Sequence, residues 1–249
     1  MPGAPRNDVH PAITRSAGVV SATDQLIVAL DQPTLRDALT CAQRLKGLVR
    51  WVKVGSILFT AAGPEAVARM RGLGLRVMLD LKFFDIPSTV ELSCRAAVRQ
   101  RVALVTVHAS GQREMLEAAM RGIHEEARKT RIKPPQVLAV TVLTSTGAGA
   151  ARGTRRRVLD LARGAQHAGC DGVVASAREA PALRKAFGRT LRILCPGIRP
   201  RHAQMGDQER IATPAEAVAR GADWLVVGRP ITAAADPRRA AERILQEME

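Results

Sequence analysis

The segment Asp80–Val90, DLKFFDIPSTV, places a lysine between two carboxylates at the end of an apolar run that starts at Arg76. Successive side chains of a strand point to opposite faces, so Asp80 and Lys82 are expected on the same side, within hydrogen-bonding reach. Asp85 follows shortly after Lys82. Because two carboxylates keep a partly buried lysine charged, Lys82 is predicted to be a proton donor at neutral pH and not a neutral base.

A fixed cationic acid beside carboxylates suits a reaction in which a carbanion forms and is protonated, as in a decarboxylation. The catalytic part of the predicted site is therefore the array of Asp80, Lys82 and Asp85. Ile86-Pro87 predicts a stiff turn after it and a helix that begins near Ser88. A structural ion-pair network is the alternative, since such networks also cluster charges.

Short apolar runs recur along the chain, each followed by a turn and a segment of helical period. Eight are predicted as strands: Leu26–Leu30, Trp51–Val54, Val77–Leu81, Leu104–Val107, Val137–Leu143, Gly172–Ala175, Leu191–Leu194 and Trp224–Val227. Near-continuous apolar strands are typical of parallel sheets covered on both faces. Eight strand–helix units favour an α/β fold, a single-domain (β/α)8 TIM barrel over residues 24–249, rather than a doubly wound sheet.

In such a barrel the chemistry lies on the loops that follow the strands. Polar residues come at or just after the predicted strands: Asp31, Lys53, Asp80 with Lys82, His108, Thr144 with Ser145, Ser176, Arg199, and Gly228 with Arg229. Charges placed at random would fall at both ends of the strands, so this placement favours a functional site over a structural network. His108 stays open, as a residue that either lines the site or is a satisfied structural histidine.

These residue types suit a phosphorylated, ribose-like ligand with a polar headgroup. Arg229 after Gly228 offers a forked guanidinium beside backbone N–H groups, a good match to a phosphate dianion. Gln208, in the loop after the seventh strand, is placed to close over the same group. Asp31 and Lys53 can hydrogen-bond to sugar hydroxyls. Thr144 and Ser145 can contact the polar edge of a flat ring.

Two loops, Thr146–Thr154 and Arg199–Pro214, have the composition of lids, although ordinary surface loops are the alternative. The first 23 residues hold no apolar run of signal-peptide length, and no stretch of the chain would span a bilayer, so a cytoplasmic protein with a loose N-terminal extension is expected. The four cysteines show no metal-ligand spacing and are expected to be reduced and mostly buried: Cys41, Cys94, Cys170 and Cys195.

The net charge of +15 raises the question of nucleic-acid binding. Arginines are spread over nearly every helical segment, and an aromatic content of 2% leaves little for stacking on bases. An arginine-rich solvated surface is the better interpretation, and no specific nucleic acid is expected as a partner.

The segment DLKFFDIPSTV resembles the D-x-K-x-x-D-I-P-x-T signature of the orotidine 5'-monophosphate decarboxylase family. Further blocks of the chain resemble that family in order, from about Asp24 to the C-terminus: VALD at Val28–Asp31, KVG at Lys53–Gly55, VHAS at Val107–Ser110, VLTS at Val142–Ser145, PGIRP at Pro196–Pro200, GDQ-x-R at Gly206–Arg210 and VVGRPI at Val226–Ile231. An ordered set of this kind is highly specific.

The resemblance implies the last step of de novo UMP synthesis, in which orotidine 5'-monophosphate loses CO2 and gains a proton at C6 without metal or organic cofactor. It implies that Lys82 is the proton donor, that Asp80 holds Lys82 near the departing carboxylate, and that Asp85 and Thr89 reach the site of a neighbouring subunit in a homodimer. The ligand contacts it implies are ribose for Asp31 and Lys53, pyrimidine for Thr144 and Ser145, and phosphate for Arg199, Gln208, Gly228 and Arg229.

Phe84, Ser88 and Cys195 depart from residues common in bacterial members, and none of them is a charge in the implied mechanism. Metal-dependent sugar-phosphate decarboxylases and synthases of the same barrel superfamily are the runner-up. Those enzymes bind magnesium through a carboxylate near the end of the second strand, where this chain has VKVGS with Lys53 and no acid. No metal ligand set is therefore predicted.

Overall fold

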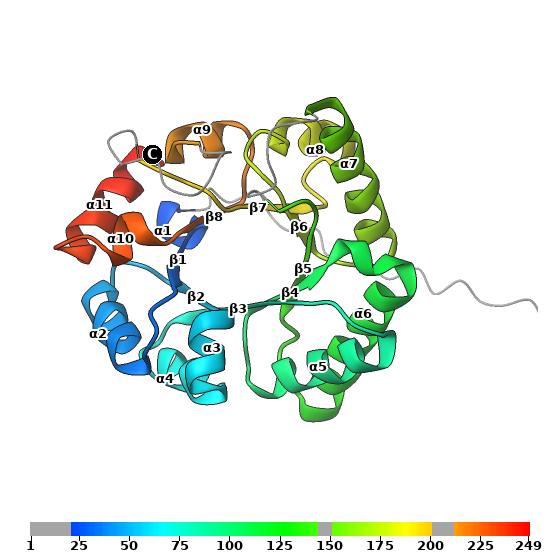
Figure 1. Cartoon of the computed structure of the whole chain (residues 1–249), viewed down its shortest axis with the longest axis horizontal. Helices are drawn as coiled ribbons and strands as arrows, with labels where there is room; N and C mark the ends of the chain where they lie inside the picture. The colour runs from blue at the N-terminus through cyan, green and yellow to red at the C-terminus, as the bar shows by residue number, and fades with distance from the viewer. Residues whose placement is uncertain (1–20, 144–150, 201–211) are drawn as a thin grey trace, which may run out of the picture.

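Eight parallel strands close into a barrel in chain order, with β8 paired to β1 (Figure 1). The structure, a computed structural model, describes residues 21–143, 151–200 and 212–249. Its strands are β1 (Leu26–Leu30), β2 (Trp51–Gly55), β3 (Arg76–Phe83), β4 (Leu104–His108), β5 (Gln136–Val140), β6 (Gly172–Val174), β7 (Arg192–Cys195) and β8 (Trp224–Val227). The predicted TIM barrel is thus confirmed.

Helices surround the barrel as an outer ring (Figure 1). They are α1 (Ala22–Gln25), α2 (Leu35–Leu45), α3 (Ser56–Ala62), α4 (Pro64–Gly72), α5 (Pro87–Arg99), α6 (Gln112–Thr130), α7 (Ala151–His167), α8 (Ala180–Phe187), α9 (Pro214–Ala219), α10 (Arg229–Thr232) and α11 (Pro237–Glu247), with a 3-10 turn η1 (Ala109–Gly111) after β4. Of the extension predicted over residues 1–23, only 21–23 are described, where α1 begins.

Buried side chains form two layers, one on each face of the sheet. The larger layer lies between strands and helices, and the smaller fills the barrel with Ile27, Ala29, Trp51, Met78, Leu104, Leu138, Val140, Val174, Leu194, Trp224 and Val226. Trp51 and Trp224 meet edge to face at 6.1 Å, and the guanidinium of Arg76 lies 4.0 Å from the centre of the Trp51 ring. The strands are apolar on both faces because both faces are covered.

Some strand and helix boundaries differ from those that the sequence predicts. The strand predicted over Val137–Leu143 ends at Val140, since Val142 and Leu143 leave the sheet to line a cavity. Helix α7 begins at Ala151, so the C-terminal part of the loop predicted over Thr146–Thr154 is helical, in keeping with the high helix propensity of alanine and arginine. Helix α5 begins at Pro87, one residue before the predicted start at Ser88.

The segment after β7 is anchored at the two points where it is described. A bridge pairs Ile198 with Ala212, and a capping box of Thr213 and Glu216 starts α9. Arg201 to Ile211 lie outside the described residues, so the lid prediction for Arg199–Pro214 is untested there.

All four cysteines are free and buried, as predicted. Burial raises the pKa of the Cys94, Cys170 and Cys195 thiols to about 12, which makes them unreactive. Within the described ranges, no helix is long and apolar enough to cross a membrane.

Candidate active site

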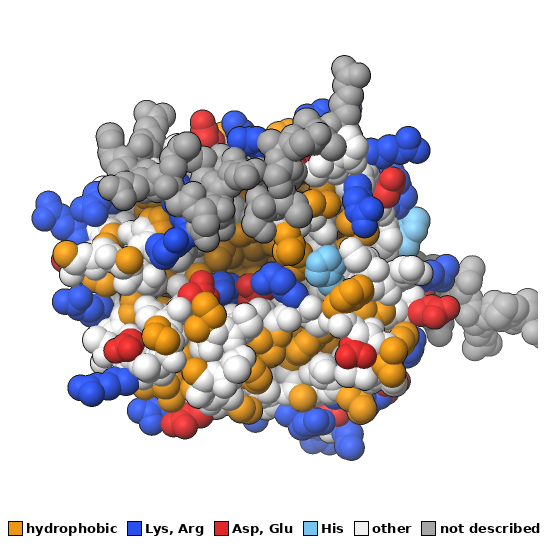
Figure 2. All heavy atoms as spheres, in the orientation of Figure 1, with side chains coloured by type: hydrophobic (Ala, Val, Ile, Leu, Met, Phe, Trp, Pro, Cys, Tyr) orange, Lys and Arg blue, Asp and Glu red, His pale blue; other side chains and the backbone are white. Residues whose placement is uncertain are grey.

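A cavity of about 500 Å³ opens at the C-terminal ends of the strands. Figure 2 shows the hollow at the centre of this face, with acidic and basic side chains gathered at it. The cavity walls include six charged residues that the sequence analysis had singled out: Asp31, Lys53, Asp80, Lys82, Arg199 and Arg229. The structure thus brings these six residues, which come from distant strands, to one place.

Four of these charges alternate in sign along a continuous chain. Lys53 Nζ donates to Asp31 Oδ1 at 2.7 Å and lies 3.6 Å from Asp80 Oδ2. Lys82 Nζ donates to the other oxygen, Asp80 Oδ1, at 2.9 Å, as the sequence predicted. Asp80 is the central member, with both carboxylate oxygens engaged and a side chain only 12% exposed, whereas the Lys82 side chain is 39% exposed and faces the cavity.

Asp80 is held in its charged form. Burial on its own raises the pKa of the Asp80 carboxyl, but the charges of Lys53 and Lys82, together with hydrogen bonds from Lys82 and Thr106, outweigh that effect and lower the pKa below its ordinary value. The Lys82 ammonium donates to this anionic carboxylate. The arrangement can therefore present a proton to a ligand while keeping a negative charge beside it.

Lys82 occupies an unusual backbone conformation. Its φ is +50°, in the left-handed region, which costs a non-glycine residue roughly 1–2 kcal/mol. The pairing of β3 with β4 shifts between Leu79 and Phe83, so Lys82 lies in a bulge and not in a regular strand. The simple alternation expected for Asp80 and Lys82 thus does not describe this segment, although both side chains reach the cavity.

Two arginines also line the cavity, Arg199 after β7 and Arg229 after β8. Arg199 is buried, and burial, reinforced by the nearby charge of Arg229, lowers the pKa of its guanidinium. Like charges held close together in a partly dry site favour an anion between them. Gly228 also lines the cavity and precedes α10, which leaves backbone N–H groups near Arg229.

Other predicted residues lie elsewhere. Asp85 and Thr89 are exposed and do not line the cavity, and Asp85 Oδ1 accepts from its neighbouring Ile86 N–H at 2.6 Å. Ser176 is buried and accepts from the Arg178 N–H, so it stabilises a turn. Three predicted ligand contacts are outside the described residues: Thr144, Ser145 and Gln208.

His108 ends β4 just outside the cavity lining. Its Nδ1 accepts from the Ser110 N–H at 3.4 Å, and its ring packs against Phe84 with centroids 5.3 Å apart. Burial and the charge of Lys82 lower the pKa of its imidazole. Of the two roles left open by the sequence, these contacts favour the structural one.

Sequence reasoning missed residues that carry no charge. Ile57, Val142 and Leu143 give the cavity an apolar wall. Thr106 contacts both Asp80 and the Lys82 backbone. The sequence feature that could have identified it is a hydroxyl residue between two valines in the apolar run of β4. Gly55 matters because a Cβ there would meet Lys53 Nζ at 2.6 Å.

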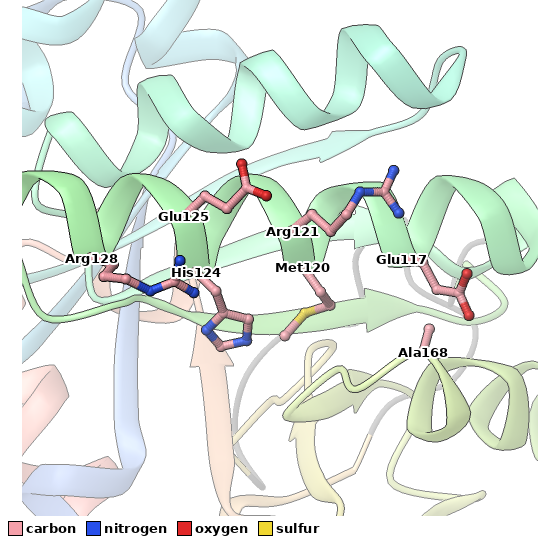
Figure 3. Close-up of a pocket in the computed structure, with 7 residues that line it drawn as sticks. All are labelled: Glu117, Met120, Arg121, His124, Glu125, Arg128 and Ala168. Atoms are coloured by element: carbon pink, nitrogen blue, oxygen red, sulfur yellow. The ribbon is translucent and has the colours of Figure 1, made fainter. Parts of the chain in front are cut away.

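A second hollow, of about 400 Å³, lies on the outer surface of α6 (Figure 3). Figure 3 shows that Arg121 and Glu125 point to one side of α6, and Glu117, Met120 and His124 to the side of Ala168. Its acidic residues pair with arginines nearby, Glu117 with Arg113 and Glu125 with Arg95. No strand end contributes to it, so the barrel mouth is the better candidate for an active site.

The part of the chain that the structure describes holds no cluster of three or more His, Cys, Asp or Glu suited to a metal ion. In β2, Lys53 lies between two carboxylates, and its ammonium meets both Asp31 and Asp80.

Comparisons with known proteins agree with the geometry of the mouth. The model of the Orotidine 5'-phosphate decarboxylase / HUMPS family matches residues 24–244. Orotidine 5'-phosphate decarboxylase of Paramagnetospirillum magneticum is 48% identical over 227 residues, which are 89% of this chain and 97% of that protein. The enzyme of the same name from Nostoc sp. is 43% identical over 91% of this chain and 98% of that protein.

Solved structures show the same relationship. The crystal structure of Orotidine 5'-phosphate decarboxylase from Lactobacillus acidophilus superposes with a TM-score of 0.78 at 35% identity, covering 90% of this chain and 99% of that one. An uncharacterized conserved protein from Geobacillus kaustophilus superposes with a TM-score of 0.77 at 34% identity, covering 90% and 100%. With a family match over most of its length, the chain belongs to the Orotidine 5'-phosphate decarboxylase / HUMPS family.

Proposed function

We propose that this protein catalyses the decarboxylation of orotidine 5'-phosphate to UMP, the last step of de novo pyrimidine synthesis. The observation that carries the proposal is the chain of alternating charges from Asp31 through Lys53 and Asp80 to Lys82, which lies at the mouth of a barrel of this family. A metal-dependent sugar-phosphate reaction is not favoured, because β2 and the residue after it read WVKVGS, with Lys53 and no acid in the region where those enzymes place a carboxylate.

The proposed roles follow the charges of the cavity. Arg199, Arg229 and the backbone at Gly228 bind the phosphate, and Asp31 and Lys53 bind the ribose hydroxyls. The pyrimidine then lies between these groups and Lys82, and Thr144, Ser145 and Gln208 are proposed to complete its contacts and those of the phosphate. Binding energy from the phosphate, remote from C6, helps to hold the reacting carbon against Lys82.

In the reaction, the bond between C6 and the carboxyl carbon breaks, CO2 leaves, and its electron pair stays on C6. The Lys82 ammonium stabilises the developing carbanion and then donates its proton to C6, becoming a neutral amine that regains a proton from solvent. Asp80 fixes Lys82 by the 2.9 Å hydrogen bond and lies beside the departing carboxylate. Charges arranged in advance need no reorganisation during the step, which is the main source of catalysis by sites of this kind.

The active unit is proposed to be a homodimer in which Asp85 and Thr89 complete the partner's site. Both residues are exposed and do not line the cavity of their own barrel. Large apolar side chains around them are exposed as well: Phe84 by 61%, Ile86 by 64% and Leu92 by 65%. Exposed apolar surface of this kind marks a protein interface. A cytoplasmic location is also proposed, on the support of the four free, buried cysteines.

The test is to add orotidine 5'-phosphate to the purified protein with EDTA present and to follow the ultraviolet absorbance as UMP forms. We expect full turnover under chelation. A folded protein that produced no UMP would refute the proposed function, and activity that was lost with EDTA and restored by magnesium would favour the metal-dependent alternative.

A further inference from the structure

Thr106 is a buried residue that contacts two charged residues of the proposed active site, Asp80 and Lys82. It sits in the middle of β4, is fully buried, and occupies the position between Val105 and Val107, opposite the bulge of β3. Its hydroxyl donates to Asp80 Oδ1 at 3.0 Å and accepts from the Lys82 N–H at 2.9 Å. One side chain thus contacts both Asp80 and Lys82, although it does not line the cavity.

The bulge explains why a hydroxyl is needed there. Leu79 pairs with Val105 and Phe83 pairs with Val107, so four steps along β3 match two steps along β4. The regular ladder cannot satisfy the Lys82 N–H, and a buried N–H group without an acceptor is costly. The Thr106 hydroxyl supplies that acceptor, and in this way supports the left-handed φ of +50° from which the Lys82 side chain reaches the cavity.

The direction of the two hydrogen bonds is also fixed. A hydroxyl has one proton to give, and at Thr106 that proton is directed at the carboxylate oxygen that also accepts from Lys82 Nζ. The Asp80 carboxylate is therefore held at one oxygen, Oδ1, by both the Thr106 hydroxyl and the Lys82 ammonium. Without Thr106, both the carboxylate and the Lys82 backbone lose a fixed partner.

We propose that Thr106 is a positioning residue for the protonation step, whose hydroxyl holds the Asp80 carboxylate and the backbone of Lys82 so that the ammonium is aimed at the reacting carbon. The inference rests on the proposed roles of Lys82 and Asp80. It adds a specific requirement, which is that the hydroxyl, and not the volume of the side chain, determines the rate.

Two substitutions separate hydroxyl from volume. Thr106→Val keeps the shape and removes the hydroxyl, and we expect kcat to fall about 10- to 100-fold, the range for losing a hydrogen bond to a charged group, with KM nearly unchanged. Thr106→Ser keeps the hydroxyl and removes a buried methyl group, so it should lower thermal stability but leave kcat within about threefold of the wild type. If the valine variant fails to fold, Thr106→Ala compared with Thr106→Ser gives the same contrast, because both lack the methyl group and differ only in the hydroxyl.

Thr141 provides the matched control. It is also a buried threonine next to the sheet, but its hydroxyl donates to the Val174 carbonyl and contacts none of the charged residues. Thr141→Val should lower stability without the drop in kcat. In addition, the acid limb of the kcat–pH profile should move to higher pH in Thr106→Val and not in Thr106→Ser, since only the valine variant loses a donor that favours the ionised Asp80.

The outcomes distinguish this inference from the proposed function. If Lys82→Ala is inactive and Thr106→Val retains the wild-type kcat, the role of Thr106 is refuted while that of Lys82 stands. If Thr106→Ser loses as much kcat as Thr106→Val, packing and not hydrogen bonding explains the effect, and the inference is again overturned. If Lys82→Ala is itself active, the basis for both fails.

Discussion

At the scale of single residues, the cavity holds several charged side chains that are partly shielded from water. A buried charge that loses its partner is strongly destabilising, whereas a chain of alternating charges gives each member a partner. Lys53 is shared by Asp31 and Asp80, and Asp80 is shared by Lys53 and Lys82. The two ends of this chain, Asp31 and Lys82, are the members left partly exposed in the cavity. Of these two, Lys82 is the cationic end and carries the proton proposed for the reaction.

Lys82→Ala should remove the proton donor while leaving the phosphate and ribose contacts in place. We expect kcat for orotidine 5'-phosphate to fall by at least about 10³-fold, toward the upper range for loss of a general acid, with UMP still bound in a calorimetric titration. The matched control is Lys46→Ala, which removes an exposed lysine at the end of α2. Near-normal turnover by Lys82→Ala would exclude Lys82 as the donor.

His108 gives the protein a dependence on pH that is separate from catalysis. Burial and the Lys82 charge lower the pKa of its imidazole in the folded state, so the folded protein binds fewer protons than the unfolded chain once the pH falls below the ordinary histidine pKa of about 6.5. Stability from this source is complete above that pH and is lost as the pH falls toward the lowered folded pKa.

The measurement is the free energy of unfolding in urea from pH 8 to pH 5, for the wild type and for His108→Asn, whose side-chain oxygen can replace Nδ1 as acceptor for Ser110. The stability of the wild type should decrease more steeply below pH 6.5 than that of the variant. The matched control is His124→Asn, which removes an exposed histidine of α6. A constant difference between wild type and His108→Asn at all pH values would contradict the assignment.

At the scale of elements, the C-terminal ends of β1, β2 and β3 act together. Neighbouring parallel strands are in register, with Ala29 beside Lys53 and Gly55 beside Asp80, so residues far apart in sequence come to one edge of the sheet. Gly55 lies at the end of β2 with φ −97°, a conformation that any residue adopts. Its small size is needed for a different reason, since a Cβ there would lie 2.6 Å from Lys53 Nζ and 3.1 Å from Asp31 Oδ1.

Gly55→Ala should therefore displace the Lys53 ammonium from Asp31 without disturbing the fold. We expect kcat/KM for orotidine 5'-phosphate to fall about 10-fold or more, mainly through KM, because the displaced pair is proposed to bind the ribose. The control is Gly72→Ala in α4, where an added Cβ has no atom within 4 Å. An unchanged KM for Gly55→Ala would show that Lys53 can move without loss of binding.

The elements also show what a sequence can and cannot predict here. The barrel was predictable because eight apolar runs recur with helical segments between them, and β1 and β8 have the predicted bounds. The strand predicted over Val137–Leu143 was too long, because the apolar run continues beyond the strand. Residues up to Val140 belong to β5, whereas Val142 and Leu143 line the cavity. The bulge at Lys82 was not predictable, since it depends on a hydrogen bond to Thr106 in the next strand, which no local pattern encodes.

At the scale of the whole molecule, each barrel supplies only part of the proposed catalytic array. Asp80 and Lys82 face the cavity of their own barrel, whereas Asp85, a few residues further along, is exposed beside the apolar side chains of Phe84 and Ile86. In a twofold dimer that buried these side chains, whatever the Asp85 of one subunit contacts in its partner is repeated the other way round, because an isologous interface is reciprocal. We propose that this contact is the partner's cavity. The segment Asp80–Val90 would then serve two sites at once.

Heterodimers test this sharing directly. When Lys82→Ala and Asp85→Ala subunits are coexpressed with different affinity tags and the mixed dimer is isolated, one of its two sites contains an intact Lys82 and an intact Asp85, so we expect about half of the wild-type activity per dimer. Each parent homodimer should be nearly inactive. The reverse pairing, wild type with a subunit that carries both substitutions, should be inactive if Asp85 acts in trans and half active if it acts in cis. Activity in this second heterodimer and none in the first would show that each barrel uses its own Asp85, and it would remove the exposed position of Asp85 as support for a shared site.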